Sequence, residues 1–128
     1  MRKSSGYRKN LGNWGESFAA EWLEGKGYQL LKRNYHTAYG EIDLIMRIDE
    51  EIVAVEVKTR KTDTFGMGES SITQKKLRAI ISCMELFLMD NPELPDSWQL
   101  DLLVIEPKPN NPPVIHHYEN VTLRDLNG

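Results

Sequence analysis

The sequence predicts an α/β fold in which two main helices flank a mixed β-sheet with a central antiparallel hairpin. Two stretches carry apolar residues at the spacing of an amphipathic helix. Between them, two runs rich in β-branched residues are joined by a short acidic turn. With 128 residues and 40% hydrophobic content, the chain can bury the core of one domain. We therefore expect a flexible basic arm over residues 1–10 and a single domain over residues 11–128.

The first helix is expected from Asn13, as its N-cap, to about Lys26, because glycines then interrupt the pattern. Its apolar residues cover a broad arc that comprises Leu11, Trp14, Phe18, Ala19, Trp22 and Leu23. Glu16 lies at the margin of this arc, where an unpaired carboxylate would be costly. It is either an edge glutamate that reaches solvent or favours the helix dipole, or a member of a site.

A strand over residues 28–35 leads into a turn at Gly40, and a hairpin over residues 40–60 follows. His36 falls in the turn region, where a lone histidine is typically a surface residue. The two arms of the hairpin are the most apolar strands of the chain, yet they contain charged residues. This conflict makes the hairpin the first place to look for function.

The charged residues of the hairpin are expected to meet on one face. Side chains alternate along a strand, so Glu56 and Lys58 share a face. A two-residue turn at Asp49 and Glu50 would place Asp43 directly opposite Glu56. Two carboxylates at ~4 Å repel by roughly 4 kcal/mol at an effective dielectric of ~20. Relief requires a retained proton, splaying into solvent, or a hard divalent cation such as Mg²⁺ or Mn²⁺.

Residues 61–71 contain glycine, threonine and serine and are expected to form a flexible loop. The second helix is expected over residues 73–89, with Ser71 and Gln74 as a capping box. Its buried stripe has the spacing of a core-facing helix and comprises Leu77, Ile80, Ile81, Met84, Phe87 and Leu88. Cys83 borders the stripe and is expected to be a packed thiol.

Another strand is expected over residues 98–105, with Asp101 as an acid in an apolar run. Asp101 is either an edge-strand charge or a support for the site. Residues 107–113 contain prolines, which cannot continue a central strand. Residues 114–121 are expected to return as a short edge strand, with His116 and His117 on opposite faces.

Composition narrows the class of protein. No apolar run reaches membrane-spanning length, and the basic N-terminus is not followed by the apolar run of a signal peptide. The single cysteine suits a reducing cytoplasm, so we expect a cytoplasmic protein. The net charge of -3 does not by itself indicate a nucleic-acid-binding protein, but basic residues cluster after the hairpin and at the start of the second helix.

Several motifs together resemble a known family. Asp43 followed by Glu56-x-Lys58 is similar to the motif of the PD-(D/E)xK nuclease superfamily. More closely, the chain resembles the YraN-type family of predicted bacterial endonucleases in the segments Gly15-Glu16, Arg33-Asn34-Tyr35, Gly40-Glu41-Ile42-Asp43-Leu44-Ile45, Val55-Glu56-Val57-Lys58-Thr59-Arg60 and Leu100-Asp101. Gln99 departs from this pattern, since an arginine is expected there.

The resemblance implies a restriction-endonuclease-like core and a Mg²⁺- or Mn²⁺-dependent endodeoxyribonuclease. Asp43 and Glu56 would be metal ligands, and Glu16 would complete or support the metal shell. Lys58 would either deprotonate the attacking water or stabilise the transition state. The nucleic-acid-binding residues would be Arg60, Lys61, Gln74, Lys75, Lys76 and Arg78.

The family is similar to archaeal Holliday-junction resolvases, so branched or single-stranded DNA is the implied partner. Roles in DNA repair and recombination would follow. A homodimer would suit symmetric cutting of a junction. The alternative is a non-catalytic module that binds nucleic acid or protein and retains the nuclease fold.

Overall fold

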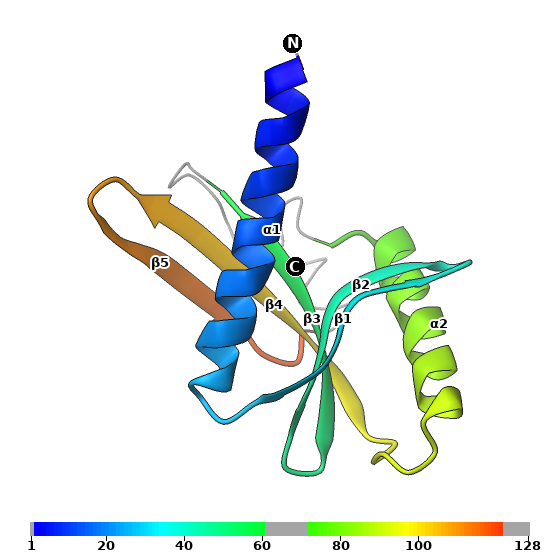
Figure 1. The fold of residues 1–128 in the computed structure, drawn as a ribbon. Coiled ribbons are helices and arrows are strands. Elements are labelled where there is room, and N and C mark those ends of the chain that lie inside the picture. The colour runs from blue at the N-terminus through cyan, green and yellow to red at the C-terminus, as the bar shows by residue number, and fades with distance from the viewer. Residues whose placement is uncertain (1, 61–71, 122–128) are drawn as a thin grey trace.

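The computed structural model describes residues 2–60 and 72–121, with side chains from residue 11 onward. The described elements are α1 (Arg2–Glu24), β1 (Gln29–Thr37), β2 (Gly40–Ile48), β3 (Glu51–Thr59), α2 (Gln74–Asp90), β4 (Trp98–Lys108) and β5 (Asn111–Tyr118). The strands form one sheet in the order β1-β2-β3-β4-β5, in which β3 and β4 are parallel and the other neighbours are antiparallel (Figure 1). The predicted α/β class, with two helices and a mixed sheet, is confirmed.

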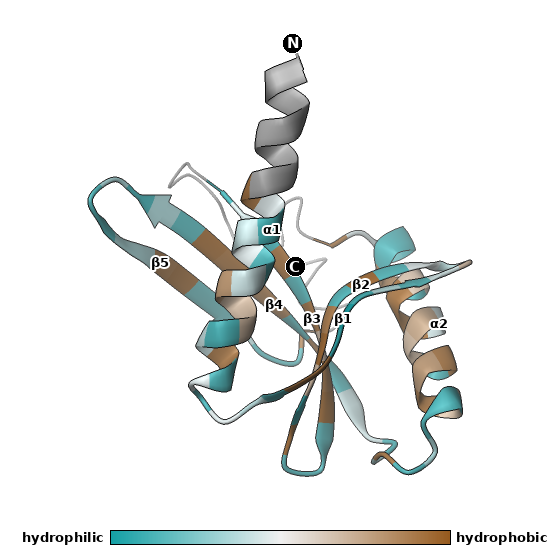
Figure 2. Ribbon diagram, viewed as in Figure 1, coloured by the Kyte–Doolittle hydropathy of each residue, from teal (hydrophilic) through white to brown (hydrophobic). Residues whose placement is uncertain are grey.

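The two helices cover opposite faces of the sheet, because successive strand residues point to opposite sides. Ala19 and Leu23 of α1 pack with Val53, Val55 and Leu103 in one core cluster. A second cluster joins α2 to the alternate strand residues and contains Ala54, Leu102, Ile80, Cys83, Met84 and Phe87. The hydrophobic central stretches of β3 and β4 lie between these layers (Figure 2). Cys83 is fully buried, as predicted for a packed thiol.

The first helix begins earlier than predicted. α1 starts at Arg2 rather than at Asn13, and residues 2–10, expected as an arm, continue the helix backbone. No proline interrupts these residues, and Gly6 costs only about 1 kcal/mol within a helix. Within residues 2–60 and 72–121, neither α1 nor α2 is long and apolar enough to cross a membrane.

The register of the central hairpin is as predicted. Ile48 pairs with Glu51, Met46 with Val53 and Leu44 with Val55. The two-residue turn closes with Asp49 in the left-handed region, at φ 53°. This register keeps the apolar faces of both strands in the core and leaves Asp43 next in line after Leu44.

The second helix spans Gln74–Asp90, close to the predicted range, but Thr73 is its N-cap. The Thr73 hydroxyl accepts a hydrogen bond from the Lys76 backbone N–H at 3.1 Å. Ser71, predicted to cap the helix, lies outside the described residues, as does the loop predicted over residues 61–71. α2 forms the connection that parallel strands such as β3 and β4 require.

Prolines interrupt the strands less than predicted. β4 continues through Pro107 to Lys108, and β5 begins at Asn111, before Pro112 and Pro113. The pairing of β4 with β5 shifts register between Glu106 and Lys108, so Pro107 sits at an irregularity where its missing N–H is tolerated. β5 is an edge strand, as predicted, and an edge leaves one row of backbone groups unpaired.

Candidate metal and phosphodiester site

The candidate site lies where β2 and β3 part. Their pairing ends at Leu44 and Val55, so Asp43 and Glu56 are the next opposed residues, at the fork between the strands (Figure 1). The Val57 N–H, which points toward β2, donates to Asp43 Oδ2 at 2.9 Å. The side chain of Asp43 thus replaces a ladder acceptor and is held beside Glu56. The predicted register is confirmed from Ile48 and Glu51 to Leu44 and Val55, and Asp43 and Glu56 are the next residues on the two strands.

Glu56 is a buried acid with an unmet hydrogen-bonding demand. Its side chain is 1% exposed, and Oε2 has no hydrogen-bond partner among the described residues. Burial and then the charge of Asp43 raise the pKa of Glu56 to about 7. Native proteins rarely leave a buried polar atom unpaired, so this oxygen indicates strain or a ligand position.

The pKa values of the neighbouring acids Asp43 and Glu16 are also raised. Burial raises the pKa of Asp43, although the hydrogen bond from Val57 opposes the shift. Burial and then the charge of Asp43 raise the pKa of Glu16. All three carboxyl groups therefore lie in an environment that disfavours further negative charge.

One pocket of about 360 Å³ contains all four residues predicted to be catalytic. It is lined by Leu11, Gly12, Glu16, Asp43, Glu56, Val57, Lys58, Thr59 and Lys76. α1, β2, β3 and α2 each contribute to this pocket, which we call the acidic pocket. Glu16, Asp43, Glu56 and Lys58 are thus brought together, although their sequence separation is large.

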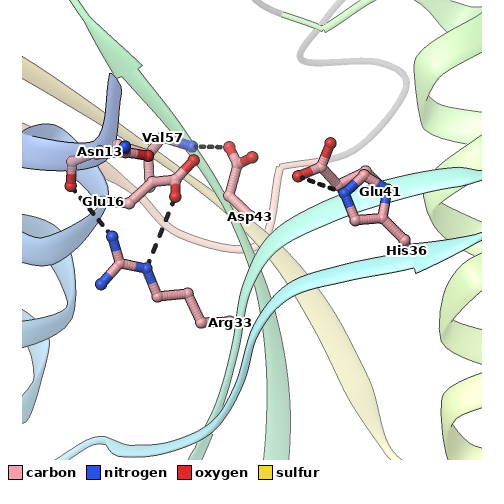
Figure 3. Close-up of polar contacts among 7 residues, drawn as sticks. All are labelled: Asn13, Glu16, Arg33, His36, Glu41, Asp43 and Val57. Carbon is pink, nitrogen blue, oxygen red and sulfur yellow. Dashed lines mark hydrogen bonds and ion pairs between the residues drawn. The ribbon is translucent and has the colours of Figure 1, made fainter. Parts of the chain in front are cut away.

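Glu16 is held at the acidic pocket by β1 (Figure 3). Arg33 Nε lies 3.7 Å from Glu16 Oε1, and Arg33 Nη2 donates to the Asn13 carbonyl at 3.1 Å. With its amide turned to donate, Asn34 lies 3.1 Å from Glu16 Oε1 and 3.2 Å from Glu41 Oε2. This arrangement favours the site role over a solvent-facing edge glutamate, because the Glu16 side chain is only 16% exposed.

A glycine brings Glu16 close to β3. A Cβ atom on Gly15 would collide with the Thr59 hydroxyl, so glycine at this position lets the helix approach the strand without a shift of the Thr59 side chain. His36, by contrast, is a surface residue as predicted. Its Nε2 lies 3.5 Å from Glu41 Oε2 and its side chain is 72% exposed (Figure 3).

Lys76 lies at a position that its expected role as a nucleic-acid contact does not predict. Its Nζ lies 3.0 Å from Glu56 Oε1. The signal was present in the helix pattern, since Lys76 precedes the buried Ile80 by one turn and shares its face.

The other nucleic-acid-binding candidates that the structure describes lie outside the lining of the acidic pocket. Gln74, Lys75 and Arg78 are exposed on the first turns of α2, and Arg60 follows β3. Lys61 lies outside the described residues. Gln74, Lys75 and Arg78 thus sit on the helix whose Lys76 reaches Glu56.

Asp101 does not belong to this pocket. It pairs with Val55 across β3 and β4 and faces the α1 layer. Its carboxylate accepts hydrogen bonds from Gln99 Nε2 at 2.8 Å and from the Asn120 N–H at 2.9 Å, and it contacts His117 Nε2 at 2.8 Å. Asp101 is therefore not an edge-strand charge, because β5 pairs with β4. Its partners come from β4, from β5 and from the segment that follows β5, and it does not line the acidic pocket.

The chemistry of the donors fits a hard divalent cation. Carboxylate oxygens are the ligands that Mg²⁺ and Mn²⁺ prefer, and the acidic pocket presents Asp43, Glu56 and Glu16 with one unpaired buried oxygen. In residues 2–60 and 72–121, no three acidic, histidine or cysteine side chains are already gathered at ligand spacing. A cation would therefore have to draw these carboxylates together.

The fold and the pocket define a small α/β protein with an acidic site at a strand fork. Residues 15–105 match the model of the Uncharacterised protein family UPF0102, and the chain belongs to this family, whose members are YraN-like. The matched segment contains every described residue of the acidic pocket except Leu11 and Gly12.

Two relatives are similar to this protein over most of the chain. A UPF0102 protein of Syntrophomonas wolfei is 41% identical over 97 residues, which cover 76% of this chain and 84% of the relative. A UPF0102 protein of Sulfurihydrogenibium is 40% identical over 109 residues, with 85% and 90% covered. The predicted YraN-type membership is thus confirmed at the level of the family.

Proposed function

We propose that this protein is a Mg²⁺- or Mn²⁺-dependent DNA endonuclease that hydrolyses phosphodiester bonds, with branched DNA such as a four-way junction as its substrate. The observation that carries the proposal is the buried, unpaired Glu56 oxygen opposite Asp43, in one pocket with Lys58 and Glu16. Like-charged buried acids are costly to a fold, and a divalent cation removes that cost.

The residues of the acidic pocket would have different roles in such a reaction. Asp43, Glu56 and Glu16 would hold the metal, which supplies charge stabilisation at the phosphoryl oxygens and lowers the pKa of bound water. Lys58 lines the same pocket, two residues after Glu56 on the same strand face. It either places positive charge where the transition state gathers negative charge or acts as the base.

One amide and several basic residues near the site would hold the DNA backbone. Gln74, Lys75 and Arg78 lie at the N-terminal end of α2, the end of a helix that favours phosphate. In the sequence, Arg60 and Lys61 directly follow β3. Binding that rests on such phosphate contacts should weaken steeply with salt, whichever DNA structure is preferred.

A second candidate is a non-catalytic module that binds DNA through the same surface. The Lys76–Glu56 ion pair favours this candidate, because it gives Glu56 a counter-charge without a metal. Metal-dependent cleavage separates the two functions.

The test is a cleavage assay on single-stranded, duplex, flapped and four-way DNA in Mg²⁺ and in Mn²⁺. Glu56→Gln should lower the cleavage rate by more than about 100-fold, beyond the usual effect of losing an outer-shell partner of a metal. Lys58→Met should abolish cleavage while metal binding persists. Glu85→Gln and Lys32→Met change the same residue types on exposed surface and serve as controls. Cleavage that survives both pocket substitutions would refute the site, and tight junction binding without cleavage would favour the non-catalytic module.

A further inference from the structure

Lys76 is the cation that compensates the buried acid of the pocket. Its Nζ lies 3.0 Å from Glu56 Oε1, and among the side chains described, those of residues 11–60 and 72–121, it is the only basic group within ion-pair distance of Glu56. The two partners differ in exposure, since the Lys76 side chain is 43% exposed and that of Glu56 is 1% exposed. The ammonium therefore enters the acidic pocket from the solvent side.

The ammonium lies against a carboxylate that the proposed metal would use. It contacts one Glu56 oxygen and leaves the other unpaired. A lysine side chain is ordinarily charged at neutral pH, so a divalent ion held by Asp43 and Glu56 would compete with this ammonium for the carboxylate charge.

Lys76 also lines a second pocket, of about 300 Å³. The other lining residues are Gly40, Glu41, Thr73, Lys75 and Ala79. This second pocket shares Lys76 with the acidic pocket and is lined by Glu41, whose side chain is 39% exposed and lies 3.5 Å from His36 Nε2. A lysine side chain is flexible enough to exchange one carboxylate for the other by rotation of its stem.

We propose that Lys76 is an internal placeholder cation, which neutralises Glu56 in the metal-free protein and is displaced toward Glu41 when a divalent metal binds. This inference rests on the proposed metal site and assigns a role to a residue that is not itself a ligand. It implies that Lys76 stabilises the empty pocket and weakens metal binding. The displaced ammonium stays at the border of the acidic pocket, where a phosphodiester anion would meet it.

Mn²⁺ binding to the full chain, measured by calorimetry, tests the placeholder directly. Lys76→Met keeps the apolar stem and removes the charge, so Mn²⁺ should bind about tenfold more tightly than to wild type, because no competing ammonium remains. Lys76→Arg retains a cation and should bind Mn²⁺ within about threefold of wild type. Lys32→Met removes a distant surface charge and should leave the affinity unchanged.

Thermal unfolding gives an independent measurement. In chelator, Lys76→Met should melt below wild type, and saturating Mn²⁺ should raise its melting temperature by more than it raises that of wild type. Lys76→Gln repeats the test if the methionine variant folds only with metal.

Two outcomes would overturn the placeholder, and they differ in what else they refute. If wild type binds Mn²⁺ and Lys76→Met binds it equally or more weakly, the placeholder role alone fails. If neither protein binds Mn²⁺, the metal site fails and the proposed endonuclease fails with it.

Discussion

Two buried carboxylates on adjacent strands have opposite environments. Asp101 on β4 is 0% exposed and Glu56 on β3 is 1% exposed. Asp101 has three partners, from Gln99, His117 and Asn120. Glu56 has one partner, the partly exposed Lys76, and one oxygen without any. Burial alone therefore does not distinguish a structural acid from a functional one.

The difference lies in how completely each charge is satisfied. A buried carboxylate that accepts several hydrogen bonds is stable as an anion, and its partners are fixed by it. A buried carboxylate that faces a second acid has a shifted pKa, and such shifts concentrate at functional sites. Asp101 locks β4 to β5, whereas Glu56 leaves a position for a cation at the fork of β2 and β3.

The largest expected effect comes from removing the satisfied acid. Asp101→Ala should lower the free energy of unfolding by about 3–5 kcal/mol, because His117 and the Asn120 N–H then lose their buried partner. Glu56→Gln should leave metal-free stability equal or higher, because it removes the repulsion with Asp43. Chemical denaturation of both variants in chelator checks the contrast, and equal losses would remove the distinction between the two acids.

The second effect is a pH dependence of stability that arises from Glu56. The folded protein raises the pKa of Glu56 from 4.5 to about 7, so the folded state holds a proton that the unfolded state has released between these values. Stability is therefore greatest below pH ~4.5 for this group and declines as pH rises through 7, by on the order of 3 kcal/mol.

Denaturation in chelator at pH 5 and at pH 8 measures this decline. Glu56→Gln should flatten the profile, and Asp43 and Glu16 contribute the remaining slope with the same sign. Saturating Mn²⁺ should oppose the loss at pH 8, because metal binding favours the ionised carboxylate. Identical profiles for wild type and Glu56→Gln would contradict the pKa shift.

The surroundings of Glu56 can be predicted from the sequence better than those of Asp101. Strand alternation and a two-residue turn determine the register of one hairpin, so the opposition of Asp43 and Glu56 follows from local rules. The partners of Asp101 include His117 and Asn120, which reach it only because β5 folds back on β4. No local pattern encodes that return.

Other features of the fold were also beyond local reasoning. α1 starts at Arg2, although glycine and serine in residues 2–10 are typical of a flexible arm. Each of these residues costs at most about 1 kcal/mol within a helix, so the composition does not prevent one. The contact of Lys76 with Glu56 depends on how α2 lies against β3. Helix periodicity predicts the face on which Lys76 lies but not the strand residue that it meets.

The smallest expected effect concerns Gln99, where the resemblance leads us to expect an arginine. Gln99 Nε2 donates to Asp101 Oδ1 at 2.8 Å, so it supplies one of the three interactions that satisfy this acid. Gln99→Ala should lower the free energy of unfolding by about 1–2 kcal/mol, well below the effect of Asp101→Ala, because His117 and Asn120 remain. In the Asp101→Ala background the same substitution should cost less, since its acceptor is gone. A double-mutant cycle by chemical denaturation measures this coupling, and additive losses would show that Gln99 stabilises the sheet independently of Asp101.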